Sequence, residues 1–100
     1  MDTLTATAYN LLCVNLGYPP SSVPDGVKTY LQHTITAAQS RLSGAGITVS
    51  AVEDAAGLEL LIMYAAYLYR RRDSNEPMPQ SLRLALNDAK VAAATKGADA

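Results

Sequence analysis

The chain has 100 residues, of which 49% are hydrophobic and only 17% are charged, and its formal net charge is −1. This composition fits one domain with a modest core, and it excludes a disordered chain and a strongly basic chain built for non-specific DNA binding. The single cysteine excludes an internal disulfide and a cysteine-based metal site, as is usual in a reducing cytoplasm.

The first helix is predicted over residues 3–16, where apolar side chains recur on one face of a 3.6-residue period. Asp2 or Thr3 can cap its start. Gly17 then stands where a left-handed residue ends many helices. The proline-rich stretch 18–24 is predicted to be a loop, because prolines remove backbone donors and disfavour helix in the residues before them.

A second amphipathic helix is predicted from about Pro24 to Ser43. Pro24 has a backbone angle suited to a helix start, and Asp25 favours the positive end of the helix dipole. The glycine-containing stretch 44–46 ends this helix. Residues 47–49 are apolar or β-branched and could form a short strand or a loop.

The third helix is predicted from Ala51 to about Arg72. Ser50 and Glu53 match the S-x-x-E capping box, in which each side chain bonds the backbone N–H of the other residue. The apolar side chains of this segment point in nearly every direction, which indicates a buried helix. Its longest apolar run, residues 60–69, is too short to span a bilayer, so a soluble chain without membrane contact is expected.

The fourth helix is predicted after Pro79, with Leu82, Ala85, Leu86 and Ala89 on one face and Leu84 and Val91 off it. The alanine-rich end has no larger apolar anchor. The predicted fold is therefore all-α: a compact four-helix domain over residues 1–90 and a flexible C-terminal tail over residues 91–100.

No enzyme signature is present, and no catalytic residue, metal ligand set or cofactor site is predicted. His33 is the only histidine, and no further histidine or carboxylate stands at ligand spacing from it, so a surface or packing role is expected. Cys13 lies mid-helix without a basic neighbour within a turn, so it is expected to be a small packing residue. The glycines at 44 and 46 lack the Lys-Ser/Thr of a phosphate-binding loop.

Three consecutive arginines, Arg70, Arg71 and Arg72, leave their role open. On a helix they spread over about 200° and cannot line one groove. They could be a solvated helix end, favoured by the dipole and paired with Asp73 or Glu76. They could instead form a subunit or partner interface together with Tyr67 and Asp73, because arginine and tyrosine dominate interface hot spots. Nucleic-acid contact is the third reading.

The order of elements resembles the small head–tail connector (adaptor, or head-completion) proteins of tailed bacteriophages. In that family a long helix closes on an aliphatic and Tyr-Arg end, a short loop follows, and a P-x-x-L-x-x-L-L/N helix comes next. The matching positions here are Leu68, Tyr69, Arg72, Pro79, Leu82, Leu86 and Asn87.

The resemblance implies a structural virion protein without catalysis. It implies a homo-oligomeric ring of twelve copies at the head–tail neck, assembled in the host cytoplasm. One face of the ring would dock on the portal protein and the other on a stopper or tail-completion protein. DNA would pass through the channel without sequence-specific binding. The tail, including Lys90, Val91 and Lys96, would engage the portal and become ordered on assembly.

The alternative is a small helical DNA-binding or regulatory module that uses the arginines at 70–72. An interaction domain unrelated to phages is a third possibility.

Overall fold

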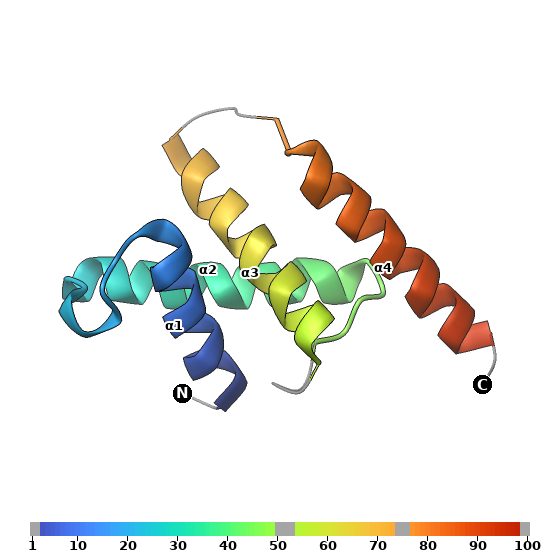
Figure 1. Cartoon of the computed structure of the whole chain (residues 1–100), viewed down its shortest axis with the longest axis horizontal. Coiled ribbons are helices and arrows are strands. Elements are labelled where there is room, and N and C mark those ends of the chain that lie inside the picture. The colour runs from blue at the N-terminus through green and yellow to red at the C-terminus, as the bar shows by residue number, and fades with distance from the viewer. Residues whose placement is uncertain (1–2, 50–53, 74–76, 99–100) are drawn as a thin grey trace.

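The computed structural model describes residues 3–49, 54–73 and 77–98 of the chain, apart from the side chains of residues 20, 73 and 94–98. It contains four helices, α1 (Thr3–Leu16), α2 (Asp25–Gly44), α3 (Ala55–Arg70) and α4 (Gln80–Ala98), and two short 3₁₀ turns, η1 (Pro20–Ser22) and η2 (Arg71–Asp73) (Figure 1). These ranges contain no β-strand. The all-α, four-helix prediction is therefore confirmed.

The ends of the first two helices follow the local signals. Gly17 has a φ of 86°, and the Tyr18 N–H donates to the Cys13 carbonyl at 2.8 Å. The left-handed glycine therefore closes α1 as predicted. Pro24 differs slightly from its prediction: it is the residue before the helix, and its carbonyl accepts from the Lys28 N–H at 2.8 Å.

The start of α3 was predicted about one turn too early. The cap is Asp54, whose carboxylate accepts a hydrogen bond from the Gly57 N–H at 3.0 Å. This contact satisfies one of the backbone donors left free at a helix start. Ser50 and Glu53, the predicted capping box, lie outside the described residues. The preceding segment 47–49 is not a strand, although Ile47 and Val49 are buried.

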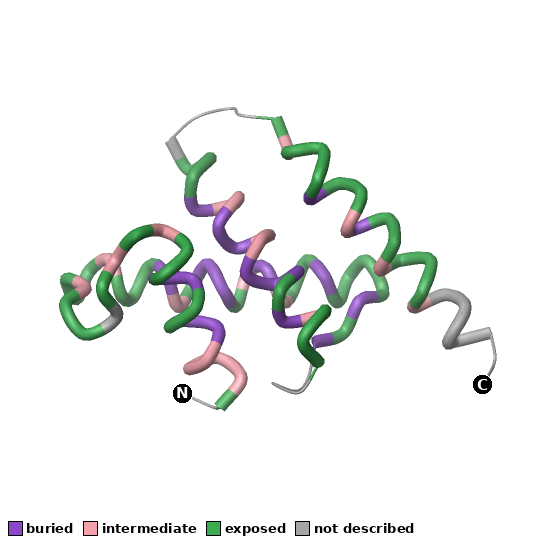
Figure 2. Tube along the Cα trace, in the orientation of Figure 1, coloured by how far each residue is buried: buried purple, intermediate pink, exposed green. Residues whose placement is uncertain are grey.

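The core surrounds α3, which packs against each of the other helices. Buried positions lie on several sides of α3, as Figure 2 shows, which confirms the prediction of a helix that is apolar all round. On α4, Leu82 and Leu86 are buried whereas Leu84 and Val91 are exposed, also as predicted. The larger side chains with the least exposure are Leu12, Leu31, Ile35, Leu42, Leu61 and Leu82.

The helix α4 is attached differently from the rest. The backbones of α1, α2 and α3 all approach one another, whereas the described part of α4 approaches α3 and neither α1 nor α2 (Figure 1). Because α4 continues to Ala98, the predicted boundary between residues 90 and 91 falls inside a helix. Ordering of the tail on assembly stays a prediction. None of the described helices is long and apolar enough to cross a membrane.

Candidate interaction surface

Tyr69, near the end of α3, joins three segments of the chain. Its hydroxyl shares a hydrogen bond of 3.0 Å with the hydroxyl of Tyr18, which follows α1. Its ring meets the ring of Tyr30 on α2 edge to face, with the centroids 6.0 Å apart. Only 8% of Tyr69 is exposed. The end of α3 is therefore fixed against both other helices of the core.

Arg72 stacks on this tyrosine. Its guanidinium carbon lies 3.8 Å from the centroid of the Tyr69 ring, and its Nη1 donates to the Tyr69 carbonyl at 2.6 Å. A cation above an aromatic face is attracted by the ring quadrupole. The stacking sets the direction of the guanidinium while the residue as a whole remains exposed.

Arg71 is held in a similar way by Tyr67. Its guanidinium lies 5.5 Å from the ring centroid, and Nη1 donates to the Tyr67 hydroxyl at 3.1 Å. The Tyr67 ring in turn meets Tyr64 edge to face at 6.4 Å. These contacts with Tyr67 fix the direction of the Arg71 guanidinium, as Tyr69 does for Arg72.

Arg70 points to a different partner, because its Nη2 donates to Asn15 Oδ1 on α1 at 3.2 Å. The three arginines therefore have three different partners. The helix was predicted to reach about Arg72 but ends at Arg70, and Arg71 and Arg72 belong to η2 and line one cleft. The predicted pairing with Asp73 and Glu76 concerns side chains outside the described residues. We use the name tyrosine–arginine cluster for Tyr18, Tyr30, Tyr67, Tyr69, Arg70, Arg71 and Arg72.

Two tyrosine hydroxyls of the fold are held in their neutral form. The hydrogen bond with Tyr18 raises the pKa of Tyr69, burial raises it further, and the charge of Arg72 partly opposes this rise. Burial also raises the pKa of Tyr9, with the Cys13 thiol as a second cause. The Tyr9 hydroxyl makes no hydrogen bond within the described part of the chain.

A cleft of about 290 Å³ lies between α2 and the end of α3. We call it the basic cleft, since His33 and Arg41 from α2 line it together with Arg71 and Arg72. None of the described acidic side chains lines it. The Arg41 guanidinium has no hydrogen-bond or ion-pair partner among the described residues. The remaining lining residues are Tyr30, Thr34, Ala37 and Leu68.

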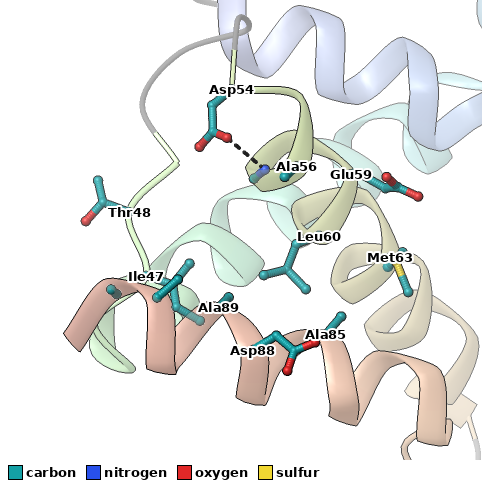
Figure 3. A pocket seen from close by; sticks show the side chains of 13 residues that line it. Ile47, Thr48, Asp54, Ala56, Glu59, Leu60, Met63, Ala85, Asp88 and Ala89 are labelled. Atoms are coloured by element: carbon teal, nitrogen blue, oxygen red, sulfur yellow. Dashed lines mark hydrogen bonds between the residues drawn. The ribbon is translucent and has the colours of Figure 1, made fainter. Parts of the chain in front are cut away.

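A larger groove of about 580 Å³ lies between the N-terminal part of α3, α4 and the segment at residues 47–48. Ile47, Leu60 and Ala89 are among its apolar lining residues, as Figure 3 shows. Its charged lining residues are Asp54, Glu59 and Asp88, and no lysine or arginine lines it. We call it the acidic groove.

The other residues named from the sequence lie apart from a reactive site. Cys13 is a free, fully buried thiol, as expected for a packing residue, and His33 is exposed on α2. Over the described residues, no three His, Cys, Asp or Glu side chains gather to hold a metal. Of the residues expected in a portal-binding tail, Lys90 and Val91 are exposed on α4, and the side chain of Lys96 is outside the described set.

Sequence reasoning missed the basic cleft and the acidic groove. A signal for the first was available: Tyr30, Thr34, Ala37 and Arg41 follow a helical period and share one face of α2. The juxtaposition of Arg41 with Arg71 could not be read from spacing, because the two belong to helices far apart in sequence.

No family model, curated protein or solved structure matches this chain.

Proposed function

We propose that this chain is a structural assembly protein rather than an enzyme. Its role would be that of the ring-forming subunit that connects head and tail of a bacteriophage virion. One face of the ring binds the portal protein and the other a stopper or tail-completion protein. DNA passes through the channel without sequence-specific contacts.

The tyrosine–arginine cluster is the observation that supports this proposal. It holds three exposed guanidinium groups in fixed directions through Tyr67, Tyr69 and the Asn15 amide. Arg70 and Arg71 each donate one described hydrogen bond, so most of the five N–H donors on each of these two guanidinium groups remain for a partner. Side chains ordered before binding lose less conformational entropy at an interface. The cluster also coincides with the junction that resembles the connector proteins.

The competing function, a DNA-binding module, fits the same arginines less well. Duplex binding calls for cations arranged along a phosphate backbone, and its affinity falls steeply with salt. Arg70 turns to α1, whereas Arg71 and Arg72 line a cleft beside α2. The net charge of −1 gives the chain no general attraction for DNA.

The test measures assembly and stability separately in Arg72→Ala. We expect the loss of the stacking on Tyr69 to lower the free energy of unfolding by only about 0.5–1 kcal/mol. Ring formation, followed by sedimentation velocity and electron microscopy with and without isolated portal, should fall much further. The matched control is Lys28→Ala. Lys28 is an exposed cation of α2 and lines neither the basic cleft nor the acidic groove.

If Arg72→Ala assembles like the wild type, Arg72 is not part of the interface. A wild-type chain that forms no ring with or without portal, and that binds duplex DNA in a salt-sensitive manner, would overturn the proposal in favour of the DNA-binding module.

A further inference from the structure

Two surfaces of the chain carry opposite charge. Asp25, Asp54, Glu59 and Asp88 are the acidic residues whose side chains are described, and all except Asp25 line the acidic groove. Four residues that can carry positive charge, His33, Arg41, Arg71 and Arg72, line the basic cleft. The acidic groove is therefore negatively charged and the basic cleft positively charged. Neither is lined by a described side chain of opposite charge.

The two surfaces involve different parts of α3 and share no lining residue. The basic cleft lies between α2 and the C-terminal end of α3, and the acidic groove lies between the N-terminal half of α3 and α4. No ion pair joins the two surfaces within the described part of one copy. A contact between the basic cleft of one copy and the acidic groove of another leaves one cleft and one groove open for further copies.

The surfaces also complement each other in apolar character. Tyr30, which lines the basic cleft, is 42% exposed although it is a large aromatic residue. The acidic groove has an apolar lining that includes Leu60 and Met63 and has about 580 Å³ of space. Aromatic anchors that fill apolar pockets, with charged pairs around them, are the usual composition of a binding hot spot.

We propose that the basic cleft of one copy of this chain docks on the acidic groove of the next copy. The docking rests on the proposed function, because it supplies the subunit contact of the proposed ring. Arg41 and Arg71 face Glu59 and Asp88 of the adjacent copy, and the Tyr30 ring enters the groove.

This contact is heterologous: it joins two different surfaces, and such contacts repeat until they close a ring or continue as a filament. A second copy fits better than a nucleic acid, because phosphates could occupy the basic cleft but would be repelled by the acidic groove. A second copy satisfies both surfaces with one interaction.

The test reverses charge on each surface separately. The first variant carries Arg41→Glu and Arg71→Glu, and the second carries Glu59→Lys and Asp88→Lys. All four positions are exposed, so folding should be retained, and far-UV circular dichroism checks it. In either variant the two surfaces carry the same sign of charge. Like charges placed across an interface weaken it strongly, and each variant alone should lose more than about tenfold in association measured by sedimentation velocity.

Mixing the two variants gives the decisive measurement. The reversed cleft of the first variant matches the reversed groove of the second, and their unchanged surfaces also match. An equimolar mixture should therefore restore assemblies that neither variant forms alone. The control variant, Lys28→Glu with Arg83→Glu, has the same change in net charge as the first variant but alters neither surface, and it should assemble like the wild type.

The results separate this docking from the proposed function. If both variants assemble like the wild type, or if the mixture stays dissociated, the docking is wrong, while rings formed by the wild type would still support the connector function. A wild-type chain that remains monomeric at its highest soluble concentration also overturns the docking. Duplex DNA binding that is lost with Arg41→Glu and Arg71→Glu, in a chain that does not self-associate, overturns both.

Discussion

The hydroxyl pair of Tyr18 and Tyr69 allows a test of how firmly the tyrosine–arginine cluster is built. The perturbation is the set Tyr18→Phe, Tyr69→Phe and the double variant, each of which keeps the ring and removes only a hydroxyl. Tyr69→Phe leaves the Arg72 stacking and the Tyr30 ring contact in place. Any loss of stability therefore comes from the 3.0 Å hydrogen bond and from the changed hydration of the Tyr18 and Tyr69 hydroxyls.

The magnitude follows from burial. A net hydrogen bond contributes about 0.5–1.5 kcal/mol, and leaving a buried partner unsatisfied costs about 1–3 kcal/mol. Tyr69 is 8% exposed, whereas Tyr18 is half-buried. Tyr18→Phe, which leaves the Tyr69 hydroxyl without its partner, should therefore cost about 1–2 kcal/mol, and Tyr69→Phe about 1 kcal/mol. The double variant should cost less than the sum of the single variants.

The assay is urea unfolding followed by far-UV circular dichroism, with the free energy of unfolding extrapolated to zero urea. In a domain of this size each 1 kcal/mol corresponds to a Tm change of about 4–8 °C, which thermal scans resolve. We expect a coupling energy of about 1 kcal/mol between the two sites. Additive single variants, with a coupling energy near zero, would refute the hydrogen bond and the fixed position of Tyr69.

Three further predictions concern the fold. Leu61→Ala removes a fully buried side chain of α3 and should lower the free energy of unfolding by about 2–5 kcal/mol in urea titrations, and a change near zero would mean that the core is misplaced. Gly17→Ala forces an alanine to a φ of 86° and should cost about 1–2 kcal/mol by the same measurement, even though the position has open space; no loss would show that α1 ends differently. The raised pKa values of Tyr9 and Tyr69 contribute stability that is complete below the unfolded pKa of about 10 and is lost as pH rises through the folded values. Tm should therefore fall above that pH and fall less in Tyr69→Phe, and identical alkaline losses in both chains would contradict the role of Tyr69.

The fold could be predicted from the sequence wherever the signal was local. Periodic apolar positions identified four helices, and Gly17 identified the end of the first. The start of α3 was misplaced because two adjacent polar signals compete: Ser50 and Glu53 match a capping box, while Asp54 also precedes an apolar run. Local pattern does not decide between them, and the structure uses Asp54 as the cap.

The candidate surfaces were less predictable for a physical reason. The stack of Arg72 on Tyr69 joins residues three positions apart in the sequence and could have been anticipated. The contact of Tyr69 with Tyr18 depends on how the segment after α1 packs against α3. The contact of Tyr69 with Tyr30, and the shared cleft of Arg41 and Arg71, depend on how α2 packs against the end of α3. Side-chain periodicity defines the faces of each helix but not which residues face each other across the packing.

The separate attachment of α4 has a consequence for hydrogen exchange. Because its described backbone approaches α3 and neither α1 nor α2, opening of α4 separates fewer helix pairs than opening of α1, α2 or α3. Its amides should then exchange with solvent at a lower free energy than those of α3. Opening also removes one wall of the acidic groove, since Asp88 and Ala89 belong to α4. A partner that binds only the closed groove raises the free energy of opening α4 by an amount set by the partner's concentration and Kd. The exchange rate of the α4 amides is therefore a label-free measure of whether the groove is occupied.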